Sequence, residues 1–156
     1  YVTGVEVGIG SNGRKNRGGH QMEALVEEYL KNACVEYYKE MYLTEIENKW
    51  NIDLSAVSAK GTSTKRWDFV VKTKSKIFVI ETNFYASSGS KLNETARSYK
   101  MIAEEAKEIP NFEFVWITDG AGGKDAKRNL EETFIVLENL YNITDMENGI
   151  LNRIFK

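Results

Sequence analysis

Two acidic residues are spaced so that they could meet across a hairpin. Asp68 lies early in one strand-like segment and Glu81 lies late in the next, with Asn83 two residues further on. Antiparallel pairing would bring Asp68 back beside Glu81, and strand periodicity puts Asn83 on the same face as Glu81. Two such carboxylates repel each other, and an oxygen-seeking divalent cation, Mg²⁺ or Mn²⁺, would remove that penalty. In the structural alternative, Asp68 lies at a frayed strand end and Glu81 pairs with a lysine.

Two strand-like segments, residues 66–72 and 76–84, carry these acids, and the short polar stretch between them predicts a hairpin. The second segment is apolar on both faces, which is typical of a central strand. A helix predicted at 91–108 begins with Lys91, and a buried strand follows at 112–118. Strand, helix and strand in this order favour a right-handed parallel crossover.

The remaining segments complete an alternating order of elements. Apolar residues at helical spacing predict an amphipathic helix over 20–33, which could run on to Trp50, with or without a break. Residues 54–59 could form a weak strand, whereas 124–141 predict a long helix and 146–156 a short one. The order α-β-β-β-α-β-α predicts an α/β fold with a mixed central sheet flanked by helices.

Composition favours one globular domain. The chain has 156 residues, of which 42% are hydrophobic, 12% aromatic and 28% charged, which excludes a disordered chain. The single cysteine, Cys34, excludes a disulfide scaffold, fits a reducing cytoplasmic location and is expected in the core. No apolar run could span a membrane, and no signal peptide opens the chain. Because the chain begins with Tyr1, we expect residues 1–156 to be a single domain from the C-terminal part of a longer protein.

Three familiar motifs fail in their context. Residues 8–13 spell G-x-G-x-x-G, but polar residues separate them from the helix, so the Gly-rich opening is interpreted as a loop. The Gly-Gly-Lys at 122–124 is followed by Asp where a phosphate-binding loop needs Ser or Thr. One His and one Cys cannot form a zinc site of the usual kind.

The acid motif resembles that of the PD-(D/E)xK nuclease superfamily, with Asp68, twelve intervening residues and then Glu81-Thr82-Asn83. The flanking sequence is similar to the DpnII/MboI group of type II restriction endonucleases, at residues 11–20, 22–27, 81–85, 90–99 and 112–120. This resemblance implies a restriction-endonuclease-like core of α-β-β-β-α-β order. It also implies a single nuclease domain that hydrolyses double-stranded DNA at GATC sites, with Mg²⁺ or substituting Mn²⁺, as a homodimer.

By this resemblance, Asp68 and Glu81 would ligate the metal, and an activated water would attack the scissile phosphorus with a 3′ oxygen leaving. Glu23 matches a helical position where the superfamily often adds an acid, and Glu27, one turn further on, is its substitute. The alternative for both helical acids is a solvated surface.

The lysine of the superfamily motif is replaced by Asn83, whose amide can bind a water or a phosphate oxygen but carries no charge. Lys91 could supply the missing charge, or could be an ordinary exposed lysine. The competing interpretation is a DNA-binding module of the same fold that is catalytically inert or has a different specificity, such as a repair-type or degenerate nuclease.

Taken alone, the net charge of −2 argues against a nucleic-acid partner, but the charge is unevenly distributed. Between positions 60 and 76, one acid stands among six basic residues: Lys60, Lys65, Arg66, Lys72, Lys74 and Lys76. The acids gather in the predicted helices. Basic residues in the Gly-rich opening and near position 124 are the expected phosphate and base contacts. The predicted DNA-binding residues are Arg14, Lys15, Asn16, Arg17 and Lys124.

Overall fold

In the described part of the chain, five strands form one mixed sheet in which neighbouring strands follow the chain order β1-β2-β3-β4-β5. The computed structural model describes residues 11–57, 65–85, 90–120 and 137–155. The strands are β1 (Glu36–Tyr42), β2 (Arg66–Lys72), β3 (Ile77–Tyr85), β4 (Phe112–Gly120) and β5 (Leu140–Tyr141). The first three strands pair antiparallel, and β3, β4 and β5 pair parallel. The predicted α/β class, the hairpin and the parallel crossover pair are therefore confirmed.

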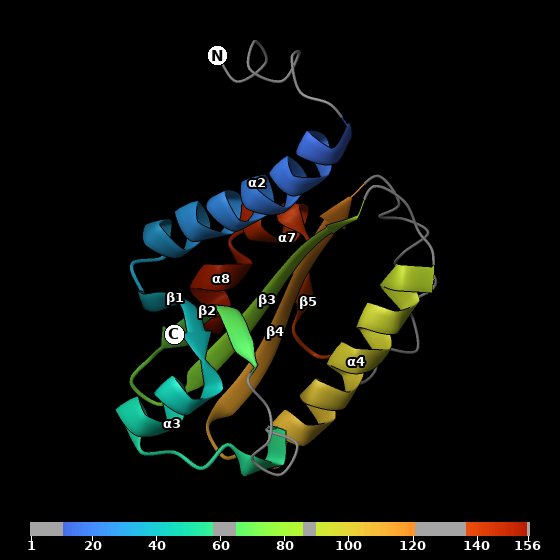
Figure 1. Cartoon of the computed structure of the whole chain (residues 1–156). Helices are drawn as coiled ribbons and strands as arrows, with labels where there is room; N and C mark the ends of the chain where they lie inside the picture. The colour runs from blue at the N-terminus through green and yellow to red at the C-terminus, as the bar shows by residue number, and fades with distance from the viewer. Residues whose placement is uncertain (1–10, 58–64, 86–89, 121–136, 156) are drawn as a thin grey trace.

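Helices cover both faces of the sheet. The described helices are α2 (Ser11–Asn32), α3 (Leu43–Trp50), α4 (Ser90–Ala106), α7 (Ile143–Glu147) and α8 (Ile150–Ile154), with a 3-10 turn η1 (Ser55–Val57). Figure 1 shows α4 along one face and α2, α7 and α8 along the other. In β3, Ile77 and Val79 belong to the apolar cluster on the α4 side, whereas Phe78 and Ile80 belong to the cluster under α2. The sheet is thus the middle layer of three, which explains why β3 is apolar on both faces.

The surface of α4 that meets the sheet is a stripe of small residues and one aromatic residue at helical spacing. Ala96, Ala103 and Ala106 are buried, so the helix backbone can lie close to the strands. Tyr99 lies on the same stripe and packs edge-on against Trp116, with ring centroids 5.0 Å apart. The helix therefore brings one large aromatic side chain to the sheet, between smaller ones.

The N-terminal helix is longer than expected. It begins at Ser11, within the Gly-rich stretch that was expected to be a loop. Propagation adds one hydrogen bond per residue, so the packed turns around Val26 can extend a helix across glycines that cost about 1 kcal/mol each. Cys34 has φ 56° just beyond the helix and is exposed, so its expected place in the core is wrong.

The continuation of this helix to Trp50 is broken by a strand, and only its last part is helical. Residues 36–42 form the edge strand β1, because their tyrosines favour a pleated strand and their backbone pairs with β2. The chain becomes helical again only in α3, whose last residue is Trp50 and whose C-cap residue, Asn51, has φ 50°. The expected strand at 54–59 is not present in its described part, where residues 55–57 form η1.

The C-terminal part differs from expectation at two points. Residues 140–141 were expected in a long helix but form β5, and the backbone N–H of Trp116 donates to the carbonyl of Asn139 at 2.9 Å. The preceding part of that predicted helix, 124–136, lies outside the described residues. The predicted helix at 146–156 is replaced by the two short helices α7 and α8. Among the described helices, none has the length and apolar character needed to cross a membrane.

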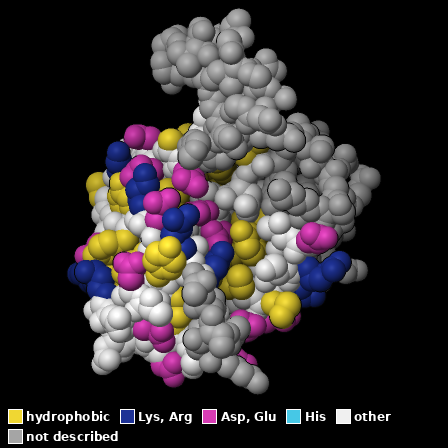
Figure 2. Space-filling model, viewed as in Figure 1, with side chains coloured by type: hydrophobic (Ala, Val, Ile, Leu, Met, Phe, Trp, Pro, Cys, Tyr) yellow, Lys and Arg dark blue, Asp and Glu magenta, His cyan; other side chains and the backbone are white. Residues whose placement is uncertain are grey.

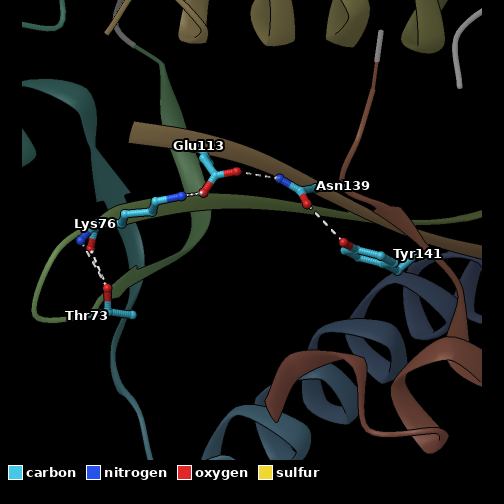
Figure 3. A network of polar contacts seen from close by, with 5 residues as sticks. All are labelled: Thr73, Lys76, Glu113, Asn139 and Tyr141. Atoms are coloured by element: carbon cyan, nitrogen blue, oxygen red, sulfur yellow. Dashed lines mark hydrogen bonds and ion pairs between the residues drawn. The ribbon is translucent and has the colours of Figure 1, made fainter. Parts of the chain in front are cut away.

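A polar network fixes the end of the sheet at which β3 and β4 begin (Figure 3). Glu113 accepts hydrogen bonds from Lys76 Nζ at 2.8 Å and from Asn139 Nδ2 at 3.2 Å. Asn139 Oδ1 accepts in turn from Tyr141 Oη at 2.9 Å. The hairpin turn joins the network because the backbone N–H of Lys76 donates to Thr73 Oγ1 at 3.0 Å. This end of the sheet is thus fastened by side chains from the turn between β2 and β3, from β4, and from β5 and the residue before it.

Candidate active site

Asp68 and Glu81 meet near the opposite end of the sheet. The pairing of β2 with β3 runs to Phe69 and Ile80, and one further step along both strands places Asp68 opposite Glu81. There the Asp68 carboxylate, in place of a backbone carbonyl of β2, accepts a hydrogen bond from a backbone N–H of β3. Its Oδ2 accepts hydrogen bonds from Thr82 N at 2.9 Å and from Thr82 Oγ1 at 3.3 Å. Asp68 is therefore held by the same strand that carries Glu81.

Glu81 occupies a desolvated position with charges of both signs beside it. The residue is 4% exposed, although it is an acid. Burial and, next, the Asp68 carboxylate raise the pKa of Glu81 from 4.5 to about 8. Lys65 opposes this rise, since its Nζ contacts Glu81 Oε1. A carboxylate pair that destabilises its own charge in this way is characteristic of functional sites.

Lys65 is the member of this site that sequence reasoning missed. In the sequence it is one of six basic residues between positions 60 and 76, whereas in the structure its Nζ contacts Glu81 Oε1. The lysine pairing that the sequence left open as a structural alternative is thus present, together with the contact between Asp68 and Glu81. The available signal was its place immediately before β2, at the sheet end where Asp68 lies.

A tryptophan orients the Asn83 side chain. Trp116 Nε1 donates a hydrogen bond to Asn83 Oδ1 at 2.6 Å, and the Trp116 ring is fully buried. In the parallel register, Trp116 lies opposite Glu81, so the donor comes from the strand beside the acid pair. Because the amide oxygen is engaged, the NH₂ group is the part of Asn83 that can donate to a ligand. Asn83 therefore offers an oriented neutral donor, not a charge.

The two helical acids lie on α2, which covers the other face of the sheet from α4. Glu27 accepts from Tyr37 Oη at 2.8 Å and pairs with Lys39 at 3.2 Å. The Tyr37 hydrogen bond is the main cause of the lowered pKa of Glu27. Glu27 is thus engaged with β1 and not with the acid pair. Glu23 is half-buried, and its role near the metal stays a prediction.

The expected DNA-contacting side chains lie outside the part of the chain that the structure describes. Residues 14–17 fall in the first turns of α2, not in a loop, and Lys91 falls in the first turn of α4. Lys124 also lies outside the described residues. Figure 2 shows basic and acidic side chains interspersed on the face in view. For example, Arg66 Nη2 lies 3.9 Å from Glu40 Oε1. The proposed DNA contacts therefore remain predictions.

The donor set of the site fits a hard divalent cation. Over the described residues, no group of three or more His, Cys, Asp or Glu side chains is placed to hold a metal. Mg²⁺, however, is commonly held by one or two carboxylates together with waters and substrate phosphates. Asp68 and Glu81 supply such a pair, and a cation between them would offset the repulsion that raises the pKa of Glu81.

The chain is similar to restriction enzymes along almost its whole length. The family model described as DpnII restriction endonuclease matches residues 1–153. The chain is 55% identical to the type II restriction enzyme DpnII of Streptococcus pneumoniae, over 99% of this chain and 55% of that protein. It is 44% identical to the type II restriction enzyme MboI of Moraxella bovis, over 96% of this chain and 51% of that protein.

A third relative, the type II restriction enzyme MjaIII of Methanocaldococcus jannaschii, is 38% identical over 99% of this chain and 54% of that protein. The chain therefore spans about half the length of these curated relatives. No solved structure matches it significantly. The family resemblance seen in the sequence is confirmed by the match to residues 1–153, and the chain belongs to the DpnII restriction endonuclease family.

Proposed function

We propose that this chain carries the catalytic centre of a type II restriction endonuclease that hydrolyses double-stranded DNA with Mg²⁺. The observation that carries the proposal is the contact between Asp68 and Glu81, in a chain of a restriction-enzyme family. The names of the relatives support a DNA endonuclease. The buried carboxylate pair supports a divalent ion as cofactor, with Mn²⁺ as a substitute.

In this proposal, Asp68 and Glu81 hold the ion through their carboxylate oxygens. When bound, Mg²⁺ would activate a water and stabilise the negative charge that develops on the phosphate. The Asn83 NH₂ group donates to a phosphate oxygen or to the attacking water, in the orientation that Trp116 fixes. The oxygen of the water bonds to phosphorus, and the bond from phosphorus to the 3′ oxygen breaks. The 3′ oxygen leaves with the bonding electrons and takes up a proton from solvent, and the attacking water releases one proton to solvent.

The proposed target, GATC, follows from the family resemblance. Since this sequence reads identically on both strands, two copies of the chain related by a two-fold axis would cut both strands symmetrically. Residues 14–17 and Lys124 are proposed to contact the DNA, with phosphate contacts giving affinity and base contacts giving specificity.

The test is plasmid cleavage by the purified chain in Mg²⁺, in Mn²⁺ and in EDTA. Three substrates are compared: a plasmid with GATC sites, the same plasmid methylated on the adenine of those sites, and a version without GATC. We expect a discrete set of fragments from the first plasmid and none from the third or in EDTA. The methylated plasmid reports whether the modification protects the site.

Site variants connect the cleavage to the acid pair. Asp68→Asn and Glu81→Gln should each lower the cleavage rate by roughly 10²-fold or more, as loss of one preorganised charged contact does. Glu113→Gln is the matched control, because Glu113 belongs to the network at the other end of the sheet. If GATC plasmids bind but are not cut in either metal, the chain is the inert DNA-binding module. Full activity in Asp68→Asn or Glu81→Gln would remove the proposed metal site.

A further inference from the structure

We propose that Lys65 is the fixed cation of this active site, a positioning residue that holds the Glu81 carboxylate beside Asp68. It would supply the positive charge that the neutral amide of Asn83 does not provide. This inference rests on the proposed nuclease function and deepens it, because it names the residue that keeps the acid pair in a productive arrangement.

The position of the Lys65 side chain is determined by the fold. Its carbonyl accepts a hydrogen bond from Leu43 N at 3.0 Å, which fixes the backbone just before β2. From there the side chain reaches across to β3, where Nζ contacts Glu81 Oε1. Side-chain exposure is 30% for Lys65 and 5% for Glu81, so the contact lies at the border between the interior and the solvent. A charged contact in such a position is screened less than one on the open surface.

Two aromatic rings hold the same ammonium. Lys65 Nζ lies 5.1 Å from the centroid of the Trp67 ring and 5.9 Å from that of the Tyr99 ring. Ring faces attract a cation but do not neutralise it, because they carry no net charge. Trp67 is 1% exposed, so packing holds at least one of these rings in place. Glu81 and the two rings thus all hold the ammonium, and Glu81 would also be a ligand of a divalent ion.

This arrangement has a specific consequence for catalysis. If a divalent ion were held by the Glu81 carboxylate, the two rings would still retain Lys65, and its charge would stay at the site. An ammonium has three N–H donors and can serve more than one acceptor. Lys65 can thus position Glu81 and contribute positive potential at the phosphate, where charge builds up during hydrolysis.

The test compares Lys65→Met, which keeps length without charge, with Lys65→Arg, which keeps the charge. Lys76→Met is the matched control, since Lys76 pairs with Glu113 at the far end of the sheet. We expect Lys65→Met to lower kcat by roughly 10²-fold or more with KM changed little, and Lys65→Arg to recover most of that loss. Lys76→Met should cut at the wild-type rate. Thermal unfolding of each variant shows whether the fold is kept, and Lys65→Gln replaces Lys65→Met if the latter does not fold.

A second readout needs no cleavage. Mn²⁺ binding to the DNA-free protein, followed by electron paramagnetic resonance, should be about tenfold tighter in Lys65→Met, because a like charge a few ångströms from the ion is removed. Lys65→Arg should bind Mn²⁺ as the wild type does. Unchanged Mn²⁺ affinity in Lys65→Met would overturn the proposal, and so would unchanged kcat in a preparation where Asp68→Asn is inactive.

The two proposals can fail separately. If the wild type does not cleave DNA, the proposed function fails, and Mn²⁺ binding alone decides the role of Lys65. If the wild type cleaves and Lys65→Met cleaves equally well, the proposed function stands and the role of Lys65 is refuted.

Discussion

Replacing Glu81 by glutamine should make the metal-free protein more stable, and increasingly so as the pH rises. The side chain keeps its shape and loses its charge. In the wild type, burial and Asp68 raise the pKa of Glu81 to about 8 from an ordinary value of 4.5. Between these two values the folded chain keeps a proton that the unfolded chain has released. The stabilising contribution of the protonated Glu81 is therefore complete below about pH 4.5 and is lost as the pH rises through 8.

The size of the effect follows from the two pKa values. Each pH unit between 4.5 and 8 should widen the stability difference between Glu81→Gln and the wild type by about 1.4 kcal/mol. Over the whole window the change is on the order of 5 kcal/mol, which is comparable with the total stability of many domains.

The assay is urea unfolding in EDTA at pH 5, 6, 7, 8 and 9, followed by tryptophan fluorescence. Glu104→Gln makes the same chemical change at an exposed position of α4 and serves as the reference. The free energy of unfolding of Glu81→Gln, relative to the wild type, should rise steadily towards pH 8 and then level off. If the stability curves of the wild type and Glu81→Gln run parallel with pH, burial does not destabilise the ionised form of Glu81, and the reasoning is refuted.

Four further changes have defined outcomes. Tyr37→Phe removes the hydrogen bond that chiefly lowers the pKa of Glu27, so it should lower the melting temperature at pH 7 and have a smaller effect below pH 4.5, where this contribution is lost. Cys34→Gly relieves a left-handed backbone at an exposed position and should stabilise the chain by about 0.5–1 kcal/mol in urea unfolding. Gly149→Ala meets no neighbouring atom within 4 Å but must adopt φ +81°, so it should cost about 1 kcal/mol by the same assay. Trp116→Phe deletes the indole donor to β3 and should reduce the cleavage rate more than it reduces DNA binding, as measured by plasmid cutting and gel shift.

The acid pair could be predicted because strand geometry leaves little choice. Side chains alternate along a strand, and a short turn fixes the antiparallel register, so the spacing of Asp68 and Glu81 already determines that they meet. The helix α4 could be predicted equally well, since its buried alanines follow a helical period. These features depend on residues close together in the chain.

The missed features depend on contacts between distant segments. Residues 36–42 form a strand because β2 offers a partner, and the strand preference of their tyrosines alone does not separate them from a continuing helix. The strand β5 has two residues, 140–141, and exists only through its pairing with β4. Lys65 looked like any of six basic residues, because its distinction is its position beside Glu81 in space. The sequence pattern indicates which face of a helix or strand is apolar. The segments that contact that helix or strand across the sheet are determined by the fold.

Because of the hydrogen bonds from Thr82 to Asp68, loss of Asp68 and loss of Glu81 during evolution would have different effects on stability. In a descendant released from the need to cut DNA, loss of charge at Glu81 would bring a gain in stability, because a buried charge disappears. Loss of Asp68 would leave the Thr82 N–H without its acceptor and would loosen the end of the hairpin. Decay of the proposed nuclease site should therefore begin at Glu81, and an inactive relative that retains only the aspartate would be the expected intermediate.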